Sequence, residues 1–235
     1  MTNKVAFLVP STTNKRDWKT IEDTYLWNIL FKDLEEKTPT ECDITVFVGY
    51  DSDDKIYHNI NERMKCNAIF KNFKIEWIDI IGNPKGNVAF IWNYLASWAV
   101  KDKFEYFKVL GDDIALPNDR AWLTAFINKL KKNNHIGWSG GYSNNDAIAT
   151  QFLIHKTHLD IFGFVYAPEI PNWGCDNFLC EIYPEKYRNW LKQYSLLNVG
   201  GEPRYEVKWN EKFVKAIVKR HKPKFNRFLS KQNNN

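Results

Sequence analysis

The sequence predicts an α/β domain of Rossmann type, a mostly parallel central sheet with helices on both faces. Short apolar or β-branched runs alternate with longer stretches of helical period, which is the pattern of strands joined by crossover helices. A chain of 235 residues has the length of one large domain. Its 44% hydrophobic and 26% charged residues are typical of a packed globular protein and exclude a disordered or fibrous one.

The first half of the chain shows four strands, each followed by a polar loop and a helix. We expect the strands at residues 4–9, 44–48, 74–81 and 106–110. The helices are expected at residues 17–37, 54–65, 88–98 and 117–132. In the third of these, apolar residues recur at i, i+3, i+4 and i+7, so one face of the helix is predicted to be buried.

The second half is less regular. Gly137, Gly140 and Gly141 loosen the chain, and one further strand is expected at residues 147–154. Helical segments are expected at residues 157–162, 176–183, 185–194 and 209–220. We expect a single domain over 1–222 and a basic, flexible tail over 223–235.

Charge and cysteine content restrict the class further. The net charge of +5 is small for a dedicated nucleic-acid binder, which usually carries a basic stripe, so no nucleic-acid partner is expected. The four cysteines show neither zinc spacing nor a disulfide pattern. No apolar run has the length of a signal-peptide core or a membrane span. We therefore expect a cytoplasmic protein with reduced thiols.

Polar residues follow each of the four strands of the first half, where ligands bind in parallel α/β sheets. These groups are Pro10–Asn14, Asp51–Asp54, Asn83–Gly86 and the pair Asp112 and Asp113. Two adjacent carboxylates repel each other unless a cation or hydrogen-bond donors offset them, and hard divalent ions bind such oxygens. The sequence thus favours a metal site, with the capping of a turn as the alternative.

The ordered set of these segments resembles the GT-A glycosyltransferases over roughly the first 180 residues. The segments that carry the resemblance are Val9–Thr12 with Asn14 and Arg16, Asp51–Asp54, Asn83–Gly86 before a helix with Asn93, Phe107–Ile114, and Trp173–Asp176. The resemblance implies a GT-A fold and a hexosyltransferase-type enzyme. It implies that residues 1–222 are the catalytic domain, with a nucleotide-binding half (1–113) and an acceptor-side half (114–222). It implies transfer of a sugar from a nucleotide-diphosphate donor, such as a UDP-sugar, to an acceptor hydroxyl.

For the donor side, the resemblance implies that Asp113 matches the last Asp of the D-x-D motif, which binds Mn²⁺ or Mg²⁺ on the donor diphosphate. Gly111 stands where the first Asp usually lies. His221 matches a His that completes the metal shell in many relatives, with a solvated histidine as the alternative, so the implied metal set is Asp113, Asp112 and His221. The implied nucleotide and donor contacts are Pro10, Ser11, Thr12, Arg16, Asp51, Ser52, Lys85, Asn93, Asp112 and Asp113.

For the acceptor side, the resemblance implies that Asp176, in the Trp-Gly-x-Asp segment, deprotonates the acceptor hydroxyl in an inverting reaction. The N-cap of a helix is the alternative role for this residue. Trp138, Trp173 and His155 are the candidate acceptor contacts, with packing in the core as the alternative. The acceptor is expected to be a glycan, a lipid or a protein.

Three other interpretations stay open at this point. An apolar-Gly-Asp-Asp-apolar run also occurs in the metal-binding hairpin of RNA-dependent polymerases. A catalytically silent module that binds a sugar nucleotide or a carbohydrate fits the missing first Asp. The basic run at residues 215–227 is either a solvated helix face or a contact to an anionic membrane.

Overall fold

The computed structural model describes residues 2–145, 147–201 and 210–232, and its main element is a seven-stranded sheet. The strand order is β3-β2-β1-β4-β7-β6-β8. The strands are β1 (Asn3–Pro10), β2 (Cys42–Asp51), β3 (Lys74–Ile80), β4 (Tyr106–Val109), β6 (Trp138–Tyr142), β7 (Leu153–His155) and β8 (Arg188–Ser195). The strands β1 to β4 are parallel, while β7 runs antiparallel to β4 and β6. The predicted α/β class is confirmed.

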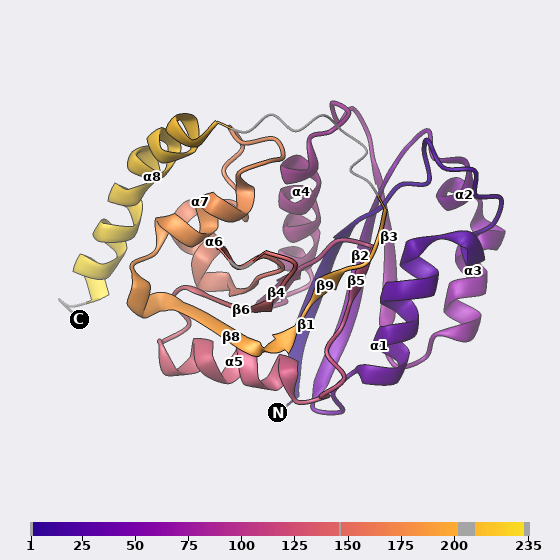
Figure 1. The fold of residues 1–235 in the computed structure, drawn as a ribbon, viewed down its shortest axis with the longest axis horizontal. Coiled ribbons are helices and arrows are strands. Elements are labelled where there is room, and N and C mark those ends of the chain that lie inside the picture. Colours follow the sequence, from indigo (N-terminus) through magenta and orange to yellow (C-terminus); the bar gives the residue numbers. More distant parts are fainter. Residues whose placement is uncertain (1, 146, 202–209, 233–235) are drawn as a thin grey trace.

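Helices cover both faces of this sheet (Figure 1). One layer consists of η1 (Ile21–Asp23), η2 (Leu26–Phe31), α1 (Lys32–Lys37), α2 (Lys55–His58), α3 (Ile60–Ile69) and α5 (Trp122–Lys132). The other layer consists of α4 (Val88–Lys101), α6 (Lys156–Phe162), α7 (Cys175–Ile182) and α8 (Glu211–Gln232). Along β1, Val5 and Phe7 pack against the first layer, and Ala6 and Leu8 against the second, because successive strand residues point to opposite faces.

Short elements complete the chain. The strand β5 (Ile114–Ala115) pairs antiparallel with β9 (Leu197–Asn198), and η3 (Glu185–Tyr187) precedes β8. All four cysteines are buried and free.

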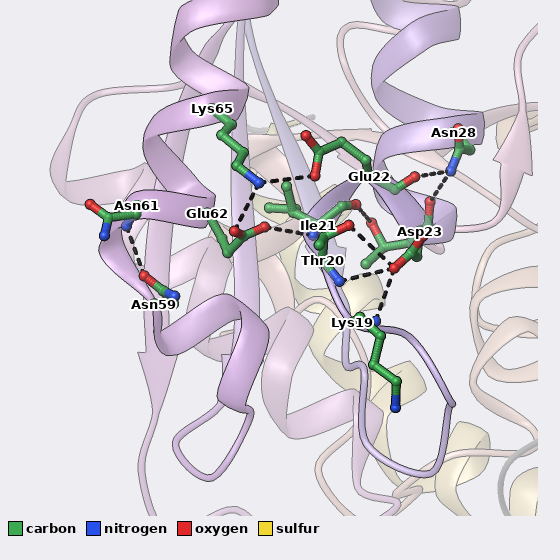
Figure 2. A network of polar contacts seen from close by, with 11 residues as sticks. Lys19, Thr20, Ile21, Glu22, Asp23, Asn28, Asn59, Asn61, Glu62 and Lys65 are labelled. Carbon is green, nitrogen blue, oxygen red and sulfur yellow. Dashed lines mark hydrogen bonds and ion pairs between the residues drawn. The ribbon is translucent and has the colours of Figure 1, made fainter.

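The helix expected over residues 17–37 starts later: η1 is a separate turn held by a polar network (Figure 2), and η2 continues directly into α1. The carboxylate of Asp23 accepts hydrogen bonds from the backbone N–H groups of Lys19 and Thr20, both at 2.9 Å, which caps a 3-10 turn. Glu62 on α3 accepts from the N–H of Ile21 at 2.8 Å. These bonds tie the first turn to the neighbouring helix α3, a tertiary contact that the helical period cannot reveal.

Two strands of the second half were mispredicted. Residues 138–142 form β6 in the glycine-rich stretch, and residues 188–195 form β8 where a helix was expected. A Cβ on Gly141 would collide with the carbonyl oxygen of Tyr194, and Gly137 has φ +99. The glycines therefore permit a close approach of β8 to β6, and do not loosen the chain.

The prediction of a flexible tail over 223–235 was also wrong for residues 223–232, the part that the structure describes. Helix α8 continues through Pro223 to Gln232, and Phe225 beyond the proline is fully buried. Proline costs an internal helix hydrogen bond, so packing of the apolar side of α8 on α6 and α7 must carry the helix past this position. The expected helix start at Trp209 and residues 233–235 lie outside the described part.

Asn93 of α4 has a structural role in place of the expected donor contact. Its Oδ1 accepts from the N–H groups of Val165 and Tyr166 at 2.8 and 3.0 Å, and its Nδ2 donates to the carbonyl of Tyr166 at 2.8 Å. It does not line the main cavity described below. The side chain fixes the segment that follows α6 against α4.

The first prediction concerns this clamp. We expect Asn93→Ala to lower the free energy of unfolding by about 1–3 kcal/mol, because it leaves the Val165 and Tyr166 backbone groups without partners. Urea denaturation measures the change, and Asn128→Ala on the exposed side of α5 is the matched control. A loss for Asn93→Ala no greater than that of the control contradicts the clamp.

Candidate active site

A cavity of about 350 Å³ opens at the carboxyl ends of β1, β2 and β4, beside the start of α4. Its walls include Pro10, Ser11, Thr12, Arg16, Asp51, Asn83, Asn87, Gly111, Asp112, Asp113, Asn172, Trp173, Asn198 and Gly201. The structure thus brings the acidic pair after β4 into one hollow with the loops after β1 and β2. Of the implied donor contacts, seven line this cavity: Pro10, Ser11, Thr12, Arg16, Asp51, Asp112 and Asp113.

The loop after β1 is held by a buried carboxylate. Asp54 is fully buried and accepts hydrogen bonds from the N–H of Thr13 at 2.6 Å and from its hydroxyl at 2.8 Å. The same carboxylate accepts from the N–H groups of Ile56 and Tyr57 at 3.2 and 3.0 Å, so it caps α2 as its position predicts. Asp54 therefore joins the loop after β1 to the one after β2.

Asp112 is directed into the same corner by a second set of hydrogen bonds. It is 3% exposed, and its Oδ2 accepts from the Ser11 hydroxyl at 2.6 Å. The Ser11 hydroxyl lies 2.8 Å from the hydroxyl of buried Tyr57. Burial raises the pKa of Tyr57 well above its usual range, and the charge of Asp112 adds to this. Tyr57 thus remains a neutral hydrogen-bonding group at the base of the site.

Asp113 is half-buried at the cavity wall. Its Oδ2 accepts from the Nδ2 of Asn198 at 3.1 Å. A Cβ on Gly200 would collide with the same carboxylate, and one on Gly111 would lie 2.7 Å from its Oδ1. Glycine at both positions leaves room for the Asp113 carboxylate.

Arg16 supplies a cation at the cavity wall. Its guanidinium carbon lies 5.5 Å from the ring centroid of Trp18 and 5.1 Å from that of Tyr25. Its Nε is buried without a hydrogen-bond partner, and no carboxylate of the described chain pairs with the side chain. Such a guanidinium, held by aromatic faces, matches a phosphate.

Two polar side chains face the cavity from the neighbouring loops. Burial raises the pKa of Asp51, and the charges of Asp53 and Asp54 reinforce this. Asn83 after β3 has a buried Oδ1 without a partner in the described structure. Buried polar atoms normally have partners, so this acceptor is suited to a donor group on a bound ligand.

Asp176 lies at the start of α7 and lines a second cavity of about 210 Å³. The walls are almost entirely amide, hydroxyl and carboxylate groups: Ser143, Asn144, Asn145, Thr150, Gln151, Asp176 and Asn198, with Leu196. Asn198 belongs to both cavities, so the second cavity adjoins the first near Asp113. Burial raises the pKa of Asp176 to about 6, although the Tyr166 hydroxyl, which donates to it at 3.1 Å, lowers this value.

Gln151 links the two cavities. Its Oε1 accepts from the N–H of Gly111 at 3.2 Å, while the residue has φ 54, uncommon for a side chain of this type. Its carbonyl accepts from Nζ of fully buried Lys108, which lies over the rings of Trp122 and Phe126. Burial lowers the pKa of Lys108 well below its usual range. The contact with Lys108 holds the strained backbone that sets the Gln151 side chain between the Asp112 turn and Asp176.

His221 is not brought to the metal candidates. It packs edge-on against Phe164 and Phe178, and its Nε2 lies 3.2 Å from Oε1 of Glu169. In the part of the chain that the structure describes, no three His, Cys, Asp or Glu side chains are placed to hold a metal. The Asp113 carboxylate, with Asp112 beside it, supplies too few oxygen atoms to bind a metal ion alone. It fits an ion that is also bound by the phosphates of a ligand, the usual arrangement for hard divalent ions.

The remaining implied residues divide between the surface and the core. Trp173 is 45% exposed and lines the main cavity, whereas Trp138 is 2% exposed and packs 5.0 Å from Phe152. His155 caps α6 and stacks on His135 at 4.1 Å. Neither Trp138 nor His155 lines the main cavity or the cavity beside Asp176.

Ser52 and Lys85, two of the expected donor contacts, do not line the main cavity. Ser52 is exposed in the turn after β2. Lys85 is exposed and pairs with Asp53 at 3.3 Å, and it lines a neighbouring cavity instead. Of the two expected cations, only Arg16 lines the same cavity as Asp112 and Asp113.

Several cavity residues were missed. Asn87, Asn172 and Gly201 line the main cavity, Gln151 the second, and Asn198 both. Asn87 caps α4, a signal that the sequence contains. The others lie in irregular segments late in the chain. Local sequence patterns do not predict that these segments approach the sheet.

Comparisons with known proteins agree on the fold. No protein-family model matches the chain, and no curated protein matches it in sequence. A mannosyltransferase from Pyrobaculum calidifontis, solved with GDP-Man and Mn²⁺, superposes with a TM-score of 0.60 at 9% identity, over 87% of this chain and 59% of its own. The chain thus spans less than two thirds of that protein.

A second solved structure is a cytidylyltransferase from Leptospira borgpetersenii serovar Hardjo-bovis. It has a TM-score of 0.52 at 10% identity, over 85% of this chain and 82% of its own. The likeness to both proteins shows an α/β fold that glycosyltransferases and nucleotidyltransferases share. The finer assignment depends on the site.

The second prediction concerns Asp176. Its folded-state pKa of about 6 lies above its ordinary value of 3.8, so the stability of the wild type falls as pH rises between these values. We expect Asp176→Asn to be more stable than the wild type by on the order of 1–2 kcal/mol at about pH 7.5, with the difference shrinking toward about pH 4. Urea denaturation at both pH values measures this. Asp102→Asn, exposed at the end of α4, is the control, and a difference independent of pH contradicts the burial of the Asp176 charge.

Proposed function

We propose that the chain is a glycosyltransferase that moves a sugar from a nucleotide-diphosphate sugar to an acceptor hydroxyl. The observation that carries this proposal is the juxtaposition of two cavities. One holds an acidic pair and a guanidinium, the other is polar and contains a carboxyl with a raised pKa, and Asn198 lines both. A pyrophosphate needs cationic groups, while a sugar ring and its incoming acceptor need neutral hydrogen-bonding groups and a base.

The main cavity would take the nucleoside diphosphate. Asp51 and Asn83, which line it, would contact the nucleoside, and the Arg16 guanidinium would contact the diphosphate. Asp113, with Asp112 behind it, would hold Mn²⁺ or Mg²⁺ against the phosphate oxygens. When bound, such an ion neutralises charge on the departing diphosphate. UDP is the nucleotide that the sequence resemblance favours, whereas the mannosyltransferase was solved with GDP-Man.

Asp176 would act as the base. Its carboxylate takes the proton of the acceptor hydroxyl as the oxygen bonds to the anomeric carbon and the bond from that carbon to the phosphate oxygen breaks, which releases the nucleoside diphosphate. The Tyr166 hydroxyl orients the carboxylate. A pKa of about 6 gives a base that is ionised at neutral pH yet stronger than an ordinary aspartate.

The third prediction separates the two carboxylates. We expect Asp113→Asn to weaken the binding of UDP or GDP in the presence of Mn²⁺ by at least about tenfold, and to change binding without metal little. Isothermal titration calorimetry with each nucleotide, with and without Mn²⁺, measures this. Asp102→Asn is the control, and absence of binding by the wild type to any nucleotide contradicts the proposal.

The fourth prediction concerns turnover. Asp176→Asn should retain nucleotide affinity and lose at least about tenfold in kcat for donor hydrolysis or transfer. In the wild type, kcat should rise with pH through about 6, because Asp176 must lose its proton, and this rise should be absent in the variant. Unchanged turnover in Asp176→Asn removes the residue from the role of base. Nucleotide binding with no turnover of any donor favours the silent binding module.

The polymerase alternative required a metal-binding hairpin at Gly111–Asp113. The segment instead follows a central strand, and the next strand, β5, pairs with β9 and not with β4. The structural likeness to a cytidylyltransferase favours nucleotidyl transfer as the second candidate. Release of pyrophosphate from a nucleoside triphosphate and a sugar phosphate would identify that reaction, whereas a glycosyltransferase releases the nucleoside diphosphate from a nucleotide-sugar.

A further inference from the structure

Helix α8 carries more positive charge than the whole chain. It contains eight basic residues and one acidic residue, Glu211, for a net charge of +7, against +5 for all 235 residues. The basic residues are Lys212, Lys215, Lys219, Arg220, Lys222, Lys224, Arg227 and Lys231. With 22 residues the helix is about 33 Å long. The positive charge is therefore concentrated in one elongated strip.

Most of this strip faces away from the protein, although Lys224 donates to the carbonyl of Phe162 at 3.1 Å. The apolar side of α8, with Val214, Ile217 and Phe225, is buried against α6 and α7. Only two of its cations form ion pairs in the described chain, Lys215 with Glu211 at 2.5 Å and Arg220 with Glu169 at 3.0 Å. Because the packed side holds the helix in place through Pro223, the cations form a fixed surface and not a frayed tail.

A stripe of exposed aromatic rings lies on α4, in the same helical layer. Phe90, Tyr94 and Trp98 recur at i, i+4 and i+8 and are 40%, 37% and 37% exposed. The ring centroids of Phe90 and Tyr94 lie 6.0 Å apart, and those of Tyr94 and Trp98 lie 6.4 Å apart. The Lys101 ammonium lies 5.0 Å from the Trp98 ring centroid. Rings of this size rarely remain at the surface in a row without a contact to make.

A cavity of about 390 Å³ joins the two helices. It lies between the N-terminal ends of α4 and α8, and its walls include Asn87 from the first and Phe213 and Val214 from the second. Trp173, 45% exposed, and Phe213, 43% exposed, belong to its rim. Figure 1 shows α4 and α8 on the same side of the sheet. The cavity thus adjoins the first turn of both helices, and we define the α4–α8 face as the aromatic stripe, this cavity and the basic strip.

We propose that this face, the α4–α8 face, docks onto the surface of an anionic lipid bilayer. Lys and Arg strips are attracted to anionic headgroups, and aromatic rings favour the headgroup region, where one side is apolar and the other is wet. None of the helices that the structure describes is long and apolar enough to cross a bilayer, so the contact is peripheral. The cations lie on the exposed side of a helix and line none of the cavities described above, whereas proteins that bind single-stranded nucleic acid hold the strand in a positively charged groove, so the arrangement favours lipid.

Vesicle sedimentation tests this directly and needs no enzymatic activity. The full chain is mixed with phosphatidylcholine vesicles with or without about 30% phosphatidylglycerol, at low and at high salt. We expect binding to the anionic vesicles alone, weakened by salt. A fourfold variant of the strip, Lys212→Glu with Lys219→Glu, Arg227→Glu and Lys231→Glu, should bind at least about tenfold more weakly.

The opposite helical layer and the edge of the sheet offer matched controls. Lys55→Glu with Lys74→Glu, Lys129→Glu and Lys132→Glu makes the same change of charge at exposed positions away from α8 and should keep the affinity within about twofold. Phe90→Ser with Tyr94→Ser and Trp98→Ser should weaken vesicle binding at least about threefold, whereas Ile60→Ser with Met64→Ser and Ile69→Ser, exposed on α3, should not. Circular dichroism melting verifies that each variant folds.

Several results would overturn the proposal. They are no binding of the wild type to anionic vesicles, equal binding to neutral vesicles, or equal losses in the α8 variant and its control. Tight binding to single-stranded RNA without vesicle binding would reassign the basic strip to nucleic acid. None of these outcomes depends on the glycosyltransferase proposal, which fails or stands on nucleotide titration.

Discussion

The candidate site depends on the buried carboxylate of Asp54. A fully buried aspartate is costly unless hydrogen-bond donors surround it, and here the Thr12 and Thr13 hydroxyls with three backbone N–H groups do so. Because these donors come from the loop after β1 and the start of α2, the carboxylate fixes one loop against the other. Ser11, two residues before Thr13, is thereby held where it can donate to Asp112. The three strand ends that surround the main cavity are thus joined through buried polar contacts and not through the sheet alone.

The same site shows why a loop-built cavity can be specific. Arg16 is held by two aromatic faces, Asp113 has space only because residues 111 and 200 are glycines, and Gln151 is held in a strained conformation by a buried lysine. Each group is restrained by contacts outside the cavity. The cavity is therefore largely preformed, and a ligand need not first order the loops, which lowers the entropic cost of binding.

Much of the first half was predictable because its signals are local. Four strands and their polar ends were placed from apolar runs, and a parallel sheet brings such ends to one edge, so Ser11, Asp51 and Asp112 meet as expected. The failures are residues whose role is decided by tertiary neighbours. Trp138 and Trp173 are the same residue type, yet one lies under Phe152 and the other at a cavity rim, and His221 is directed to Glu169 by the packing of α8. The strand β8 packs closely on β6 because β6 contains glycines, and in the sequence alone these glycines indicate an irregular segment.

A crystal structure of the chain grown with a nucleoside diphosphate and Mn²⁺, with anomalous data collected for the metal, tests the central claim most directly. The account predicts one manganese peak bonded to a carboxylate oxygen of Asp113 and to phosphate oxygens, with the diphosphate beside Arg16 and the nucleoside near Asp51 and Asn83. A manganese peak away from Asp113, or a nucleotide bound outside the cavity at the ends of β1, β2 and β4, would contradict it.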